Sequence, residues 1–247
     1  MRLDVYLYKN NFTASRQKAQ SAIADGIVYV NNKQITKSAF DVSNSDTVAI
    51  KGEVMPYVSR GGLKLEAAIQ AFNIGVTDYT AVDIGASTGG FTDCLLHHGV
   101  AKVYAVDCGE NQLAGKIAAD NRVIQIENCN ARYINREIIP ELCDIAVMDV
   151  SFISQTLIYP AVRNILKDGG YIITLIKPQF EAGYGNIGKH GIVKDLSVHE
   201  KVIENIINTA KIYNFHYISH IKSPIQGGDG NIEYLALFSY KNGDNNL

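Results

Sequence analysis

From Thr80 onward, short apolar runs alternate with longer stretches of helical periodicity. The apolar runs read TAVDIG, VYAVD, VIQIE, DIAVMD and YIITLIK. Strands buried on both faces of a parallel sheet have this composition, and a helix usually connects each strand to the next parallel one. The last two runs, FHYISHI and IEYLALFSY, are joined by a Gly-rich loop instead of a helix, which predicts an antiparallel pair. The sequence therefore predicts an α/β fold with a mostly parallel sheet and an antiparallel edge.

The first 55 residues follow a different pattern. ASRQKAQSAIADG has small apolar residues at helical spacing and predicts a helix that ends near Gly26. IVYVNNKQIT predicts two short strands joined by a tight turn at its Asn-Asn pair, and TVAI predicts a third strand. We expect a small α+β domain over residues 1–55, a linker over 56–63 and a larger α/β domain over 64–243.

Charge is unevenly distributed between these two parts. The chain of 247 residues has a net charge of −2, but residues 1–60 carry eight Lys and Arg against five Asp and Glu. A basic excess favours contact with a polyanion such as nucleic acid. The N-terminal part is therefore the expected docking site for such a partner.

A Gly-rich turn follows the first apolar run of the larger domain. In DIGASTGGF the spacing is Gly-x-x-x-Gly-Gly, which differs from the Gly-x-Gly-x-x-Gly of dinucleotide sites. Glycines allow a tight turn and a close approach of the backbone to a ligand. Asp83 precedes the turn, and Asp107 ends the second run, where a carboxylate can accept both ribose hydroxyls of an adenosine group.

A strand acid, a Gly-rich turn and a second-strand acid together resemble the S-adenosylmethionine site of class I (Rossmann-like) methyltransferases. The resemblance implies that Asp83 and the turn hold the amino-acid end of the cofactor, that Asp107 binds its ribose and that Asn130 borders its adenine. The cofactor-binding residues expected on this basis are Asp83, Gly85, Ala86, Ser87, Gly89, Gly90, Phe91, Asp107 and Asn130.

Four charged residues in separate motifs form the candidate catalytic set: Lys64 in SRGGLKLE, Asp149 in MDVSF, Lys177 in IKPQFE and Glu233 in GNIEYL. Three of these motifs adjoin predicted strands, and open α/β sheets build their sites at strand ends. Removing a proton from a ribose hydroxyl requires a base, and a buried lysine beside a second cation can serve because its pKa falls. We expect Lys177 to be this base, Lys64 to supply the neighbouring charge, Asp149 to hold Lys177, and Glu233 to orient Lys64 or the hydroxyl.

The order Lys-Asp-Lys-Glu resembles the tetrad of FtsJ-like 2′-O-ribose methyltransferases. Because it also contains the motifs SRGGLKLE, DIGASTGGFTD, MDVSFIS, IKPQFE and GNIEYL, the chain is identified as a member of the hemolysin A/TlyA family of rRNA 2′-O-methyltransferases. Ser87-Thr88 stands where Ala-Pro is usual in FtsJ proteins, and this change is itself typical of the hemolysin A branch. The resemblance implies ribosomal RNA or ribosomal subunits as partners and cytidine 2′-hydroxyls as targets.

The N-terminal motifs RLDVYL and SRQKAQSAIADGIVYVN resemble the RNA-binding domain named after small-subunit ribosomal protein S-four. The alternative is an amphipathic helix whose basic face is only solvated. The residues expected to contact RNA are Arg2, Ser15, Arg16, Lys18, Lys33 and Arg60.

The four cysteines form no Cys-x-x-Cys pair, so we expect neither a metal site nor a redox motif. His97 and His98, near a predicted helix end, are expected to cap the helix or to be solvated. The sequence shows no apolar signal core and no run long enough to span a membrane, which predicts a soluble cytoplasmic protein.

Two other functions are compatible with parts of this pattern. A non-catalytic RNA-binding or ribosome-assembly factor would be favoured by a broken tetrad or cofactor turn, and both are intact. A membrane-lytic hemolysin would need a spanning segment or a strongly amphipathic basic helix. The Gly-rich segment 182–191 is expected to be a mobile loop that closes over RNA, with a passive surface loop as the alternative.

Overall fold

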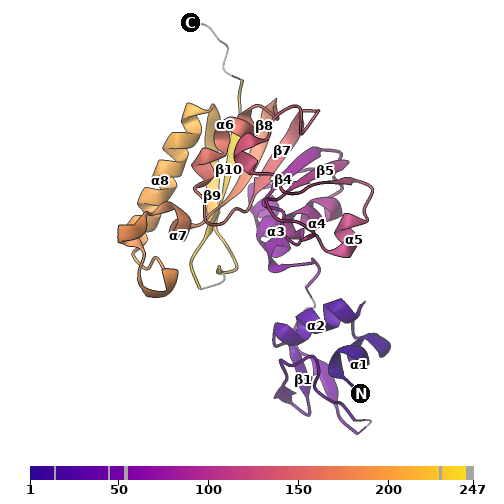
Figure 1. The fold of residues 1–247 in the computed structure, drawn as a ribbon. Coiled ribbons are helices and arrows are strands. Elements are labelled where there is room, and N and C mark those ends of the chain that lie inside the picture. Colours follow the sequence, from indigo (N-terminus) through magenta and orange to yellow (C-terminus); the bar gives the residue numbers. More distant parts are fainter. Residues whose placement is uncertain (14, 44, 53–54, 228–229, 243–247) are drawn as a thin grey trace, which may run out of the picture. The chain divides into compact units, whose positions relative to one another are not determined.

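The computed structural model describes residues 1–13, 15–43, 45–52, 55–227 and 230–242, and it divides into two compact units, Met1–Pro56 and Tyr57–Leu247 (Figure 1). The boundary differs from the expected one, because residues 57–63 belong to the second unit instead of forming a linker. The Tyr57 ring is buried in that unit. It lies against Gly62, where an added Cβ would come within 2.3 Å of Tyr57 Cγ. The Gly61-Gly62 pair, which falls within the predicted linker, is therefore a site of close packing.

The first unit has two helices and a three-stranded antiparallel sheet of order β2-β1-β3. The predicted hairpin is confirmed: Val30 pairs with Lys33 across Asn31 and Asn32, which both have positive φ, as this tight turn requires. The predicted helix ends before Gly26, whose φ is +73°. The elements are α1 (Leu3–Lys9), α2 (Arg16–Ala24), β1 (Val28–Val30), β2 (Lys33–Gln34) and β3 (Val48–Ile50). Leu3, Leu7 and Ile23 lie in its small apolar core.

The second unit contains a seven-stranded sheet of order β6-β5-β4-β7-β8-β10-β9. The five apolar runs predicted as parallel strands pair in parallel, and the last two strands are antiparallel at one edge. The predicted α/β class is therefore confirmed. The strands are β4 (Thr80–Ile84), β5 (Lys102–Val106), β6 (Val123–Ile126), β7 (Cys143–Met148), β8 (Leu166–Ile176), β9 (Phe215–Lys222) and β10 (Tyr234–Tyr240).

Helices cover both faces of this sheet (Figure 1). Successive strand residues point to opposite faces, so Ala81 packs in the core cluster beneath α3 and α4, while Val82 packs in the one beneath α6 and α8. The α-helices are α3 (Arg60–Phe72), α4 (Gly90–His97), α5 (Gly115–Ala118), α6 (Tyr159–Arg163), α7 (Pro178–Glu181) and α8 (Leu196–Ile212). Short 3-10 turns are η1 (Ala131–Tyr133), η2 (Gln155–Leu157), η3 (Tyr184–Asn186) and η4 (Lys189–Gly191).

The antiparallel strand β10 brings the C-terminal part of the chain to the functional edge of the sheet. Tyr234, its first residue, pairs with Ile176, the last residue of β8. Glu233, directly before β10, and Lys177, directly after β8, are therefore placed at the same edge, where β4 and β7 also end. Among the helices of the described residues, none is both long enough and apolar enough to span a bilayer.

Candidate active site

Two lysine–carboxylate pairs lie at this edge of the sheet. Lys64, on α3, donates to Glu233 Oε2 at 2.6 Å, and both residues are buried, with 8% and 2% of their surface exposed. Lys177, directly after β8, has its Nζ 2.6 Å from Asp149 Oδ1, directly after β7. This second contact is an ion pair by distance, while the directed hydrogen bond of Lys177 goes to Ser151 Oγ at 2.8 Å. Charges buried to this degree persist only when they are paired.

The two pairs share one cavity of about 320 Å³. Lys64, Asp149 and Lys177 line it, and Glu233 lies behind Lys64 instead of on the wall. The Gly-rich turn and the start of α4 form another part of the wall. The structure thus brings the four tetrad residues together from α3 and from the ends of three strands.

Two further residues support the tetrad and were not singled out from the sequence. Ser151 accepts the hydrogen bond from Lys177, and Gln179 donates to Glu233 Oε1 at 3.2 Å. Each belongs to a motif already recognised, MDVSF and IKPQFE. The sequence shows where Ser151 and Gln179 lie in these motifs. Their hydrogen-bond partners depend on how three strand ends come together in the fold.

The Gly-rich turn is shaped by two glycines at positive φ, Gly85 (+84°) and Gly89 (+87°). A Cβ added at Gly85 would come within 2.5 Å of the backbone oxygen of Asp149, so a larger residue would push the turn away from β7. The backbone N–H groups of Gly85 and Ala86 both donate to the Val106 carbonyl oxygen. The turn is therefore fixed between β5 and β7, the two neighbours of β4.

Gly90 and Phe91, also predicted to bind the cofactor, contribute to the packing of α4 against α3. An added Cβ at Gly90 would come within 2.2 Å of Ser59 Oγ, so α3 and α4 approach closely there. Phe91 is buried, and its ring belongs to the apolar cluster between α3, α4 and the sheet. Gly90 and Phe91 line the cavity together with Ala86 and Ser87.

Asp107 and Asn130 lie on a second cavity, of about 430 Å³, which shares Gly85, Ser87, Asp149 and Ser151 with the first. Asp107 accepts the N–H of Ser87 at 2.8 Å and that of Gly109 at 2.8 Å, one on each oxygen. A carboxylate has about four lone-pair sites, so its capacity to accept further hydrogen bonds is not exhausted. Asn130 caps η1 by accepting the Arg132 N–H at 3.1 Å, which fixes the side chain at the cavity wall.

Asp83 is fully buried at the end of β4. Its Oδ2 accepts the Thr92 hydroxyl at 2.6 Å, and its Oδ1 has no hydrogen-bond partner among the residues that the structure describes. Burial, reinforced by the carboxylates of Asp149 and Asp107, raises the pKa of Asp83 to about 7 despite the hydrogen bond from Thr92. A buried oxygen without a partner beside the Gly-rich turn fits a site that receives a hydrogen-bond donor or a cation.

This raised pKa predicts a specific pH dependence. An unfolded Asp titrates near 3.9, so between about pH 4 and 7 the folded protein holds a proton that the unfolded chain lacks. The stability contributed by protonated Asp83 is complete below that range and is lost as the pH rises through 7. Asn at this position cannot ionise, so the free energy of unfolding of Asp83→Asn, relative to wild type, should increase from pH 5 to pH 8. Denaturant titrations at several pH values measure this difference, and a difference independent of pH would contradict the assignment.

In the first unit, Arg2 and Arg16 converge on the buried carboxylate of Asp4. Arg2 Nε lies 3.1 Å from Asp4 Oδ1, and Arg16 Nε lies 2.8 Å from Asp4 Oδ2, which also accepts Gln20 Nε2 at 2.8 Å. These hydrogen bonds, led by that from Arg2, hold the pKa of Asp4 well below its usual range. Both arginines remain half exposed, so one buried acid organises two cationic groups at the surface.

The remaining predicted RNA-binding residues are spread over both units. Ser15 caps α2 by accepting the Lys18 N–H at 3.1 Å, and Lys18 Nζ donates to the Met55 carbonyl oxygen. Lys33 is exposed on β2. Arg60, the first residue of α3, belongs to the second unit and lines the cavity that holds Lys64 and Lys177.

The segment predicted as a mobile loop over RNA forms the turns η3 and η4, with His190 at φ +64°. Asn231, which is buried, anchors its end by donating to the Gly191 carbonyl at 2.9 Å and accepting the Val193 N–H at 3.1 Å. Asn231 precedes Glu233 by two residues, so the loop and the tetrad share one anchoring segment. Closure over RNA stays a prediction.

Residues 57–240 match the FtsJ-like methyltransferase family, and residues 1–48 match the S4 domain. The chain is 46% identical over 239 residues to Hemolysin A of Brachyspira hyodysenteriae, in an alignment that covers 96% of this chain and 99% of the relative. It is 36% identical over 235 residues to the 16S/23S rRNA (cytidine-2′-O)-methyltransferase TlyA of Mycobacterium tuberculosis, covering 95% of this chain and 88% of the relative.

A solved structure shares the fold over nearly the whole chain. It is a Streptococcus thermophilus protein described as a candidate hemolysin, with 45% sequence identity and a TM-score of 0.78, and the match covers 98% of this chain and 89% of that one. The family match spans most of the chain and includes all four tetrad positions. The chain therefore belongs to the FtsJ-like methyltransferase family and carries an S4 domain in its N-terminal unit.

Proposed function

We propose that this protein transfers the methyl group of S-adenosylmethionine to a ribose 2′-hydroxyl of ribosomal RNA, with cytidine as the target nucleotide. One observation carries the chemistry: the pairs Lys64–Glu233 and Lys177–Asp149 meet at the same cavity as the Gly-rich turn. The S4 domain and the activity named for the Mycobacterium tuberculosis relative support the RNA substrate and the cytidine. Because ribosomal RNA is the substrate, we place the reaction in the cytoplasm.

The residues around the two cavities fit the cofactor. Asp107, with unused acceptor capacity, would bind the ribose hydroxyls, and Asn130 would border the adenine of the same cavity. Asp83 and the backbone of residues 85–91 would hold the amino-acid end. Asp83 Oδ1, which has no partner within the described part of the chain, would accept a hydrogen bond from that end or contact its cationic group. When bound, S-adenosylmethionine supplies an electrophilic methyl group on a sulfonium sulfur.

The tetrad would then prepare the attacking oxygen. Once deprotonated, Lys177 would take the proton of the 2′-hydroxyl onto Nζ, and the ribose oxygen would then be the nucleophile for the methyl group that the cofactor supplies. Asp149 and Ser151 hold Lys177 Nζ in position and would stabilise the ammonium that results. Lys64, fixed by Glu233, would donate to the ribose oxygen and orient it. Gln179 would keep Glu233 in place.

The first unit would bind RNA without contributing to the chemistry. It contains Arg2 and Arg16, which are organised by Asp4, and the exposed Lys33, whereas the four tetrad residues belong to the second unit. Cationic groups of this kind contact phosphates and do not by themselves read a base sequence. Arg60, on the wall of the catalytic cavity, would contact the strand that carries the target ribose.

The test is to map methylated nucleotides. Purified ribosomal subunits and free ribosomal RNA that lack the modification are incubated with the full chain and labelled S-adenosylmethionine, and 2′-O-methyl groups are located by reverse transcription at low nucleotide concentration. We expect label in RNA and new stops at cytidines. Label on a base instead of a ribose would overturn the reaction, and RNA binding without any label would favour a non-catalytic assembly factor.

A further inference from the structure

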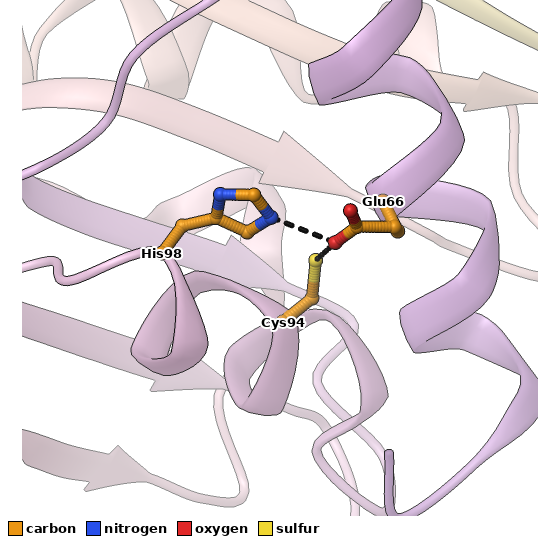
Figure 2. A group of neighbouring side chains, drawn as sticks. All are labelled: Glu66, Cys94 and His98. Atoms are coloured by element: carbon orange, nitrogen blue, oxygen red, sulfur yellow. Dashed lines mark hydrogen bonds and ion pairs between the residues drawn. The ribbon is translucent and has the colours of Figure 1, made fainter. Parts of the chain in front are cut away.

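A cluster of three ligand-type side chains lies away from the two cavities, between α3 and α4. Glu66 extends from α3, while Cys94 and His98 lie four residues apart on one face of α4 and its C-terminal cap (Figure 2). One ligand atom from each residue falls within 4.8 Å of the others. The thiol is buried, while 30% of the His98 and 24% of the Glu66 side chain is exposed, so an ion has a route to the cluster.

Three contacts of this cluster converge on one atom. Glu66 Oε2 accepts from the Tyr57 hydroxyl at 2.6 Å, lies 2.7 Å from His98 Nε2 and lies 3.7 Å from Cys94 Sγ. One carboxylate oxygen has two lone pairs, so it cannot accept well from the Tyr57 hydroxyl, the Cys94 thiol and a protonated His98 Nε2 at the same time. The weakest of them is the thiol, whose pKa burial raises. A cation at the centre of the trio would remove this competition.

We propose that Glu66, Cys94 and His98 form a Zn²⁺-binding site. Zinc prefers thiolate, imidazole and carboxylate ligands in tetrahedral geometry, and these three side chains leave a fourth position for a water molecule. One thiolate and one carboxylate balance the charge of the ion, which lowers the cost of burying it. On binding, the Cys94 thiol releases one proton to solvent, and neutral His98 contributes the Nε2 lone pair while its proton resides on Nδ1.

The surroundings of Glu66 resemble those of a metal-binding carboxylate. The Tyr57 hydroxyl holds Oε2, and Gln70 Nε2 holds Oε1 at 2.5 Å, so both oxygens are oriented before an ion arrives. Bound zinc would link α3 to α4. These helices carry Lys64 and Gly90, respectively, so the ion would fix the packing on which the catalytic cavity depends without touching the substrate.

The experiment uses the full chain after removal of metal with EDTA. Co²⁺ is added as a spectroscopic substitute, and we expect one equivalent to bind with a thiolate-to-cobalt charge-transfer band that Zn²⁺ abolishes by displacement. Zn²⁺ alone should release about one proton per site in weakly buffered solution and raise the melting temperature by several degrees. No charge-transfer band, and no thermal shift with Zn²⁺, would overturn the proposal.

Matched variants locate the site. Cys94→Ser and His98→Gln should lose the band and the thermal shift, whereas Cys143→Ser and His97→Gln, which change the same residue types outside the trio, should keep both. Cys94 and Cys143 are equally buried, so packing effects are matched. If Cys94→Ser fails to fold, His98→Gln decides the question, because His98 is partly exposed. A band that survives in His98→Gln would exclude this site.

Discussion

Replacing Lys177 with arginine should lower the rate of methyl transfer by about 100-fold or more and leave cofactor affinity unchanged. Arginine retains a positive charge and can still pair with Asp149, but its guanidinium does not lose a proton near neutral pH, so it cannot accept the proton of the ribose hydroxyl. Single-turnover transfer of labelled methyl to ribosomal RNA measures the chemical step, and calorimetry with S-adenosylmethionine measures the affinity.

Lys167→Arg is the matched control. Lys167 lies on the same strand, β8, and its Nζ also forms a 2.6 Å ion pair with an aspartate, Asp144, but it is exposed and far along the strand from the cavity. We expect wild-type rates from this variant. Near-wild-type transfer by Lys177→Arg would mean that the proton leaves by another route, and the base would have to be sought among the other groups of the cavity.

Most of the sheet could be predicted because its strands are buried on both faces. Val82, Val103 and Ile145 lie in runs that have nearly the same composition on both faces, and this pattern distinguishes a parallel interior strand from a half-solvated one. The Asn31-Asn32 turn could also be predicted, because a tight hairpin turn needs two consecutive residues with positive φ and asparagine tolerates this conformation.

The domain boundary was harder because glycine has two opposite uses. In a linker it supplies freedom, and in a packed helix it makes room for a neighbour. Gly61 and Gly62 fall within the predicted linker, but the Tyr57 ring occupies the space that a Cβ at position 62 would fill. Only the three-dimensional neighbour distinguishes the two cases.

Site residues could be predicted from the sequence when they are charged and directly follow a predicted strand. Lys177 and Asp149 have this position, and they were expected to act together. Ser151 and Gln179 were not singled out, because a neutral polar side chain gains a role only from the partner it meets. The same holds for Glu66. Cys94 and His98 stand four residues apart in the sequence, but two such residues did not suggest a metal site, and the third member of the trio comes from another helix.

Gly85→Ala should abolish tight cofactor binding and lower the free energy of unfolding by about 3 kcal/mol. Two physical terms add at this position. A residue with a Cβ at φ +84° costs about 1 kcal/mol, and the Cβ itself would lie 2.5 Å from the Asp149 backbone oxygen, which cannot move without displacing the end of β7. A displaced turn also weakens the bond from the Ser87 N–H to Asp107, the carboxylate proposed to bind the cofactor ribose.

Gly169→Ala separates the two terms. Gly169 has nearly the same φ, +77°, but an added Cβ would meet no atom within 4 Å, so only the conformational cost of about 1 kcal/mol applies and cofactor affinity should not change. Denaturant unfolding and calorimetry with S-adenosylmethionine compare the two variants with the wild type. Because both substitutions place alanine at a similar positive φ, any excess loss in Gly85→Ala measures the collision with β7. Equal losses of stability, with cofactor affinity intact in both variants, would show that the turn can shift freely and that its contact with Asp149 does not shape the cofactor site.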